Sequence, residues 1–388
     1  MKDSDPEKNK VLEMCDIWIK DFKFDNLAST YVAQKKTQLL LKEFAKTEDV
    51  KLECDVQIYV CEAYECEKLR KYTEAEKKYK KAIKIREKQL KNITITNTDN
   101  KSKCFEYQKD IANWHNKLAT LEKIYLKRYQ LALKNYKKAI ESIDKIINNK
   151  EKAFDYNLNV TFTFANTYLN YADLLVYQLD DDTSAKENVL KDYKAAEENY
   201  KNAIEILEKY PKNTEDDHFF LAQTYISLAN LQNNDLKDYK SAEGNYMKAI
   251  EYLENHPKDS ENNLYTLATT YYLLANVQYI DLDENESAQS YYEKAEEILI
   301  KLPKDNQEYQ STLAYVYRVY AILLTDVKYK HNLAQDYYNN AINIRKIISK
   351  DDLLEQYALA NEYDLLAKLQ HYNLSSIIHR PKITTKTL

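Results

Sequence analysis

Six copies of one string of residues constrain the fold of this chain more than any other feature. Each copy is an alanine, an aromatic residue four positions later and a second alanine three positions after that. The last four copies are spaced by 46 residues each. A fixed period in this range predicts a solenoid of repeated units. The copies are Ala75-Tyr79-Ala82, Ala132-Tyr136-Ala139, Ala196-Tyr200-Ala203, Ala242-Tyr246-Ala249, Ala288-Tyr292-Ala295 and Ala334-Tyr338-Ala341.

A second string runs in phase with the first. It is an apolar residue and alanine, an aromatic residue three positions on, and alanine four further. Spacings of three and four place each string on one face of a helix. Alanine lets two helices approach closely and the aromatic ring fills the space between them, so each repeat is predicted to be a helical hairpin. The clear copies are Leu221-Ala222-Tyr225-Ala229, Leu267-Ala268-Tyr271-Ala275, Leu313-Ala314-Tyr317-Ala321 and Leu359-Ala360-Tyr363-Ala367; looser ones are Val56-Tyr59-Ala63, Ile111-Ala112-His115-Ala119 and Phe164-Ala165-Tyr168-Ala172.

These strings resemble the tetratricopeptide repeat family, whose second helix carries A-x3-F/Y-x2-A followed by proline. Pro211, Pro257 and Pro303 each stand eight residues after the second alanine of a repeat. The usual glycine of the first helix is alanine here, the usual tryptophan is absent, and the period exceeds the family's length of about 34 residues. The long repeats and the segment Ile85-Arg86-Glu87-Lys88 are similar to the variant of this repeat that is found in kinesin light chains. The resemblance covers roughly residues 50 to 371 and implies an all-α, right-handed α-solenoid.

The expected organisation has three zones. Residues 1–48 are predicted to be capping helices, and a separate partner-binding bundle is the alternative. Residues 49–371 form the superhelix, with insertions near 92–103 and 179–191 that are either tolerated loops or protruding contact elements. Residues 372–388 are predicted to be a loose tail. The six helix pairs are expected at 50–91, 104–149, 152–210, 215–256, 261–302 and 307–350, followed by a capping helix over 352–371 that should close the core.

Composition excludes several classes of function. Gly244 is the one glycine in 388 residues, so glycine-rich phosphate loops and dinucleotide fingerprints cannot be built. A net charge of −5 makes nucleic acid an unlikely partner. No stretch approaches the roughly 20 apolar residues of a membrane span. Residues 1–10 do not resemble a secretory signal, and the five cysteines are few and odd in number. We therefore expect a cytoplasmic protein.

Candidate chemical groups are sparse. Asp180, Asp181 and Asp182 lack the spacing and glycine of a calcium loop. Cys61 and Cys66 have no histidine nearby in sequence, and His115 occupies a position where other repeats carry tyrosine. We predict no catalytic activity, no metal, no cofactor and no small-molecule substrate.

Asparagine recurs immediately after core alanines, on the first helices that should line the concave side. The resemblance implies that such asparagines hold the backbone of a bound peptide, since a carboxamide offers both a donor and an acceptor. The alternative is that asparagine is simply common in this chain. The candidates are Asn166, Asn230, Asn276 and Asn361, with Asn113 as a further occurrence.

Tyrosine is abundant, with 36 copies, and some fall where the groove should open. Exposed tyrosine favours interfaces because it offers a large area and a polar tip. With Arg318 and Lys368 nearby, the groove would suit a peptide bearing acidic and apolar groups. The aromatic candidates are Tyr272 and Tyr315, with Phe219, Tyr265 and Tyr357 in similar positions.

The predicted function is a non-catalytic scaffold or adaptor that binds a protein or peptide partner in the groove. One alternative is a bacterial peptide-sensing regulator, in which residues 1–48 contact a regulated protein. An RNA-binding repeat is weaker, because the basic run from Arg70 to Lys91 lies mainly on a second helix that should face outward.

Overall fold

The structure of the chain is a computed structural model. The structure describes residues 47–93, 98–147, 158–181, 189–209, 215–255, 260–327, 329–350 and 352–378, with several more between 34 and 45. All the regular elements in this described part are helices, so the predicted all-α repeat architecture is confirmed. The chain divides into two compact units, Met1–Ile206 and Leu207–Leu388, and the division falls within one helix.

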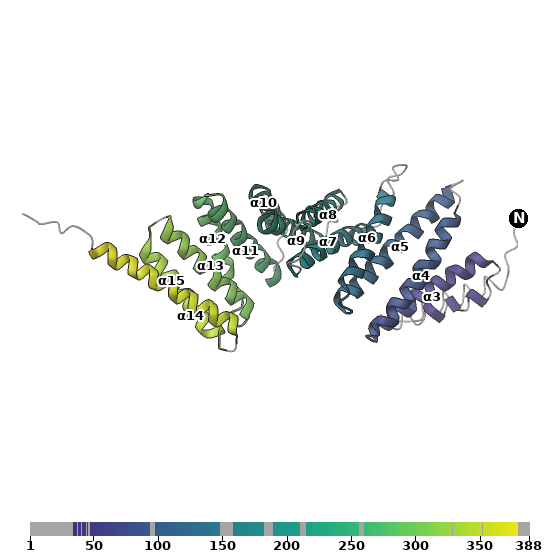
Figure 1. Cartoon of the computed structure of the whole chain (residues 1–388), viewed down its shortest axis with the longest axis horizontal. Helices are drawn as coiled ribbons and strands as arrows, with labels where there is room; N and C mark the ends of the chain where they lie inside the picture. Colours follow the sequence, from purple (N-terminus) through teal and green to yellow (C-terminus); the bar gives the residue numbers. More distant parts are fainter. Residues whose placement is uncertain are drawn as a thin grey trace, which may run out of the picture. The chain divides into compact units, whose positions relative to one another are not determined.

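Each unit is a series of antiparallel helices in which most helices pack on the next in the chain (Figure 1). The first unit holds α3 (Glu48–Lys68), α4 (Tyr72–Asn92), α5 (Thr98–Ile124), α6 (Tyr129–Ile147) and α7 (Leu158–Asp181), and most of α8 (Val189–Lys209). The second holds α9 (Glu215–Leu231), α10 (Tyr239–Asn255), α11 (Glu261–Asn276), α12 (Asn285–Leu299), α13 (Gln307–Asp326), α14 (His331–Ile348) and α15 (Leu353–Ile378).

Two helices differ in extent from the sequence-based expectation. Helix α5 begins at Thr98, inside the segment expected to be a linker, and its exposed residues 101–103 show why no apolar period marks this turn. Helix α15 continues to Ile378, seven residues into the expected tail. Residues 179–181 and 189–191 of the expected insertion belong to the end of α7 and the start of α8, and residues 182–188 lie outside the described part, as does most of the expected N-terminal cap.

The core consists of the strings that define the repeats. All six second-helix copies are buried, with every alanine fully covered and every tyrosine at most 3% exposed. In α9, α11 and α13 the alanines and the tyrosine of the first-helix string are buried as well. The small–large–small order therefore works as predicted, because close backbone approach leaves room only for the ring between two alanines.

A polar residue on the first helix satisfies the hydroxyl of the buried second-helix tyrosine in four repeats. A buried hydroxyl without a partner would cost free energy, so the position after the second alanine of the first helix carries an acceptor. The pairs are Tyr136 with Thr120 (3.2 Å), Tyr200 with Asp173 (2.6 Å), Tyr246 with Asn230 (2.5 Å) and Tyr292 with Asn276 (2.7 Å).

A second set of tyrosines joins one repeat to the next. The first-helix tyrosine donates its hydroxyl to a carboxylate five residues after the second alanine of the preceding repeat. The pairs are Tyr168 with Asp144, Tyr225 with Glu208 and Tyr271 with Glu254. His115 takes the place of the tyrosine in α5, and its Nε2 lies 4.0 Å from Glu87 Oε1 at the matching position. These contacts fix the register between successive hairpins.

The hairpin turns place a residue with positive φ at a repeated position. Lys237, Asp283 and Tyr329 have φ values of 56°, 58° and 51°, and they are 46 residues apart. The amide that follows each one donates to the carbonyl six residues earlier, which closes the end of the first helix. Glycine would adopt this conformation without a steric penalty, but the chain's single glycine, Gly244, lies inside α10.

The terminal helix α15 packs against α13 and α14. It buries Glu355, Glu362 and Leu369 there, so it closes the core on that side. Its own string is different from the prediction: Ala360 and Ala367 are exposed and Tyr363 is 45% exposed. The physical reason is that no described second helix packs against this face of α15.

Candidate partner-binding surface

The sequence places most of its candidate residues on the first helices α11, α13 and α15 of the second unit. We call the side of these helices that carries Tyr272, Asn276, Tyr315, Arg318 and Asn361 the first-helix surface. The helical spacing puts Tyr272 and Asn276 on one side of α11, and Tyr315 and Arg318 on the corresponding side of α13. The structure thus brings four of the predicted residues together.

Tyr315 is the centre of this group. Its ring lies 5.5 Å from the ring of Tyr272, and the guanidinium of Arg318 lies 4.7 Å from the ring centroid of Tyr315. Asn276 Nδ2 points to the Tyr315 hydroxyl at 3.5 Å. The ring contact and the bond from Asn276 join α11 to α13, and the cation–π contact lies within α13.

The tyrosines expected to open onto the groove are only partly available. Tyr272 and Tyr315 are half-buried, and burial raises the pKa of Tyr272 to about 12. Tyr265 is half-buried too, because its hydroxyl lies 2.9 Å from Thr312 Oγ1 and its ring packs on Tyr309. Tyr357 on α15 is 69% exposed. Packing between neighbouring first helices therefore uses much of the predicted tyrosine area.

The predicted asparagines fall into three environments. The carbonyl oxygens of Asn230 and Asn276 accept hydrogen bonds from the hydroxyls of core tyrosines, and the amide nitrogen of Asn276 also donates to Tyr315. Asn166 lies in the first unit and accepts a hydrogen bond from Asn170 Nδ2 at 2.8 Å. Asn361 is half-buried on α15 and makes no hydrogen bond to the described residues. Asn361 thus differs from the other predicted asparagines in having its carboxamide unused among the described residues.

The two predicted cations have carboxylates nearby. Arg318 Nε lies 3.8 Å from Glu362 Oε1, and Lys368 Nζ lies 2.6 Å from Asp364 Oδ2. Because each positive charge has an acidic neighbour, the surface has little net attraction for an acidic peptide. Its aromatic and amide groups are the more distinctive feature.

A buried ionic network beneath this surface was not predicted. Arg345 of α14 donates through Nε to Glu362 at 3.2 Å and through Nη1 to Glu355, and Ser311 donates to Glu355 at 2.6 Å. Burial raises the pKa of Glu362, while Arg318 and Arg345 act in the opposite direction. A sequence signal did exist: Arg345 stands four residues after the second alanine, where four other repeats have leucine or isoleucine.

An open pocket of about 620 Å³ lies between α13, α14 and α15 at the edge of the first-helix surface. Ile322, Leu365 and Leu369 supply apolar lining, and Lys368 and Asp326 contribute charge. Lys368 belonged to the predicted site.

The described residues offer little for catalysis. No group of three or more histidine, cysteine, aspartate or glutamate side chains among them is arranged to hold a metal ion. Burial raises the pKa of the Cys61 thiol, which disfavours the reactive thiolate. Within the described part of the chain, no helix is both long enough and apolar enough to cross a bilayer.

Comparison with known proteins gives similarities among solved structures. One is BtubC (BKLC) from P. vanneervenii, with 14% identity, a TM-score of 0.42, and coverage of 72% of this chain and 91% of that one. The apo form of RapI has 15% identity, a TM-score of 0.44, and coverage of 81% and 97%. The Rap conjugation gene regulator of the plasmid pLS20, in complex with the Phr* peptide, has 16% identity, a TM-score of 0.34, and coverage of 94% and 91%.

No family model matches the chain, and the search of curated proteins gives no match. At these identities and TM-scores the similarities carry no argument about function.

Proposed function

We propose that this chain is a non-catalytic interaction scaffold that binds a peptide segment of a partner protein on the first-helix surface. The observation that carries the proposal is the combination of Tyr357 and Asn361 on α15. Tyr357 is exposed, and Asn361 has an unused carboxamide one helical turn away. The carboxamide offers a donor and an acceptor to a peptide unit, and the ring offers area at little entropic cost.

The features around these two residues support a segment with apolar and aromatic side chains. Leu354 is 80% exposed, one turn before Tyr357, and the pocket beside Lys368 is lined largely by apolar residues. The paired charges of Arg318 and Lys368 argue against selection for acidic residues. A cytoplasmic location stays a prediction from the sequence.

The test uses a random-peptide library displayed on phage and selected against the full chain. A selected peptide is then synthesised, and its affinity is measured by fluorescence anisotropy. Tyr357→Ala and Asn361→Ala should each weaken binding by at least about tenfold. Met247→Ala, an exposed change on α10, is the matched control and should leave affinity unchanged. Failure to enrich any peptide, or affinity that neither variant alters, would contradict the proposal.

The peptide-sensing regulator is the second candidate, and it differs in the role of residues 1–48. The described N-terminal residues lie against the first repeat: Lys42 Nζ is 2.5 Å from Asp55 Oδ1, and Lys35 Nζ is 3.1 Å from Glu62 Oε1. These ion pairs support a capping role over a module that hangs apart. Residues 1–33 lie outside the described part, so the effector role remains the alternative.

A further inference from the structure

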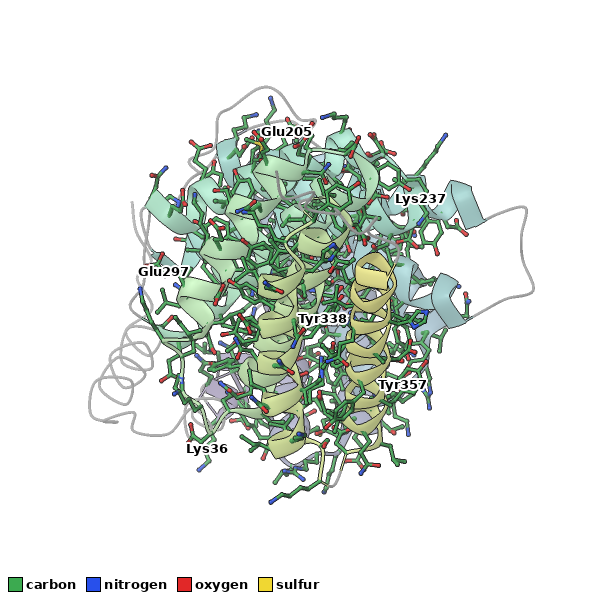
Figure 2. The ribbon with its side chains drawn as sticks, turned by 90° about the vertical axis from the view of Figure 1, so that its left-hand side faces the viewer. Lys36, Glu205, Lys237, Glu297, Tyr338 and Tyr357 are labelled. Carbon is green, nitrogen blue, oxygen red and sulfur yellow. The ribbon has the colours of Figure 1, made fainter. Side chains whose placement is uncertain are left out.

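Helix α15 exposes a face that the other first helices of its unit bury. Ala360, Tyr363 and Ala367 occupy the repeat positions of Ala314, Tyr317 and Ala321 on α13. The two alanines of α13 are fully buried and Tyr317 is 8% exposed, whereas Tyr363 is 45% exposed and both alanines of α15 are exposed. Figure 2 shows α14 and α15 side by side in front, with Tyr357 labelled on α15.

The exposed face carries apolar residues on several turns, with Gln356 and Asp364 between them. Leu353, Ala360 and Ala367 follow one another at intervals of seven residues, which places them on one side of the helix. Leu353 is 82% exposed. The outer side of a terminal repeat is normally polar, because it must remain in water. We call Leu353, Ala360, Tyr363 and Ala367 the α15 face.

The other repeats show what kind of element covers such a face. In each of them a second helix with the A-x3-Y-x2-A string packs antiparallel against the first-helix string. All six of these second-helix strings are already buried within their own repeats. Among the described residues, the small–large–small face left open is the α15 face itself, and its nearly symmetric order of alanine, tyrosine and alanine suits packing against the same face of a second copy.

We propose that two copies of this chain associate by packing their α15 faces against each other, antiparallel, about a two-fold axis. With the axis between Tyr363 and Asp364, Ala360 of one copy meets Ala367 of the other, and the reverse contact follows by symmetry. The two tyrosines are then offset by one residue, about 1.5 Å along the helix, and lie beside each other.

Charge is compatible with this arrangement. Asp364 lies close to the axis, and Lys368 of its own helix neutralises it at 2.6 Å. Lys346 of α14 places its ammonium 5.6 Å from the Tyr363 ring centroid, at the side of the face. The pairing therefore brings no uncompensated carboxylates together at the two-fold axis.

Sedimentation velocity of the full chain tests the proposal. From roughly 1 to 100 µM we expect a reversible shift from monomer to dimer. Tyr363→Glu and Ala367→Glu should each weaken the dimer at least about tenfold, because they place charge at the centre of the contact. Met247→Glu is the matched control, an exposed apolar residue on α10 that should leave the dimer intact. A chain that stays monomeric, or a dimer unaffected by both α15 changes, overturns the proposal.

Cysteine cross-linking tests the two-fold geometry. In the double variant Ala360→Cys/Ala367→Cys, each new thiol faces one from the other copy, and mild oxidation should produce a covalent dimer. Either substitution alone places the two equivalent thiols about seven residues apart along the antiparallel pair, roughly 10 Å, which is too far for a disulfide. Equal cross-linking of the single variants would contradict the antiparallel register. Peptide affinity is also measured on the Tyr363→Glu variant. Loss of the dimer with unchanged affinity for the peptide would show that the dimer contact and the first-helix surface are separate.

Discussion

The hydroxyls of core tyrosines account for polar residues that would otherwise look like ligand-binding groups. Asn276 supplies the acceptor for Tyr292 at 2.7 Å. Asn276→Ala should leave that hydroxyl without a partner and lower the free energy of unfolding by about 1–3 kcal/mol. Adding Tyr292→Phe should recover part of the loss, since the unpaired group is then gone. Asn361→Ala, on an unbonded asparagine, should change stability by less than about 0.5 kcal/mol. Urea unfolding followed by circular dichroism measures all three, and equal effects at the two asparagines would contradict this assignment.

His115 makes the stability of α5 depend on pH. Burial lowers its pKa from 6.5 to about 4, while the hydrogen bond to Asn135 at 2.9 Å acts in the opposite direction. The unfolded chain therefore binds a proton between pH 6.5 and pH 4 that the folded chain does not. Stability is fully present above about pH 6.5 and falls as the pH drops through this window. This proton uptake lowers the free energy of unfolding by about 3 kcal/mol across the window.

The measurement compares wild type with His115→Gln at several pH values. The wild-type advantage at pH 7 should shrink by about 3 kcal/mol at pH 4, because the variant has no titrating group at this position. The stability of wild type must be compared with that of the variant at each pH, because Asp110 changes the stability of both proteins with pH in the opposite direction to His115. Its burial raises its pKa from 3.8 to about 6, so it costs stability as the pH rises through that range. A wild-type advantage that stays constant with pH would refute the assignment to His115.

At the scale of elements, buried ions define how α15 docks. Arg345 and Glu362 lie where neighbouring repeats have Leu299 and Val316, and both charged residues are almost completely buried. Glu362→Val alone leaves part of the charge of Arg345 uncompensated and should cost about 3 kcal/mol or more. The double variant Arg345→Leu/Glu362→Val reproduces the apolar pair of the preceding repeat, so it should recover part of that loss; Glu355 then loses its bond from Arg345 and keeps the one from Ser311. Thermal unfolding of the four proteins gives the coupling energy; additive effects would contradict a specific ion pair.

Much of the element structure could be predicted from the sequence. Spacings of three and four residues with alanine and tyrosine leave one face to bury, so the six hairpins and their core strings follow from the pattern. The exposure of Ala360, Tyr363 and Ala367 on α15 could not be predicted in this way. Their string is identical to the buried first-helix strings, and the difference is that no described second helix packs against it. The acceptor role of Asn276 and the pairing of Arg345 with Glu362 also depend on which helices meet in space. Helical period assigns a residue to a face but does not name the residue opposite.

At the scale of the whole molecule, stability is built from contacts between successive hairpins, and each unit has its own core. One hydrophobic cluster runs from Ala229 to Leu369 inside the second unit. Two others, from Val56 to Leu121 and from Ala119 to Leu174, lie inside the first. In a solenoid each repeat contacts only its neighbours, so a run of complete repeats keeps most of its stabilising contacts when cut from the chain.

The second unit should therefore fold when it is produced alone, provided that α8 is kept as its first helix. A fragment spanning residues 189–388 retains Glu208, whose carboxylate accepts the Tyr225 hydroxyl, together with all the residues of the cluster from Ala229 to Leu369. We expect strong helical circular dichroism and a single cooperative thermal transition from this fragment. A matched fragment that starts at residue 232 lacks α9 and leaves Tyr246 without Asn230, so it should melt at a lower temperature. A gradual, non-cooperative transition in the longer fragment would show that residues before 189 are needed to hold these hairpins together.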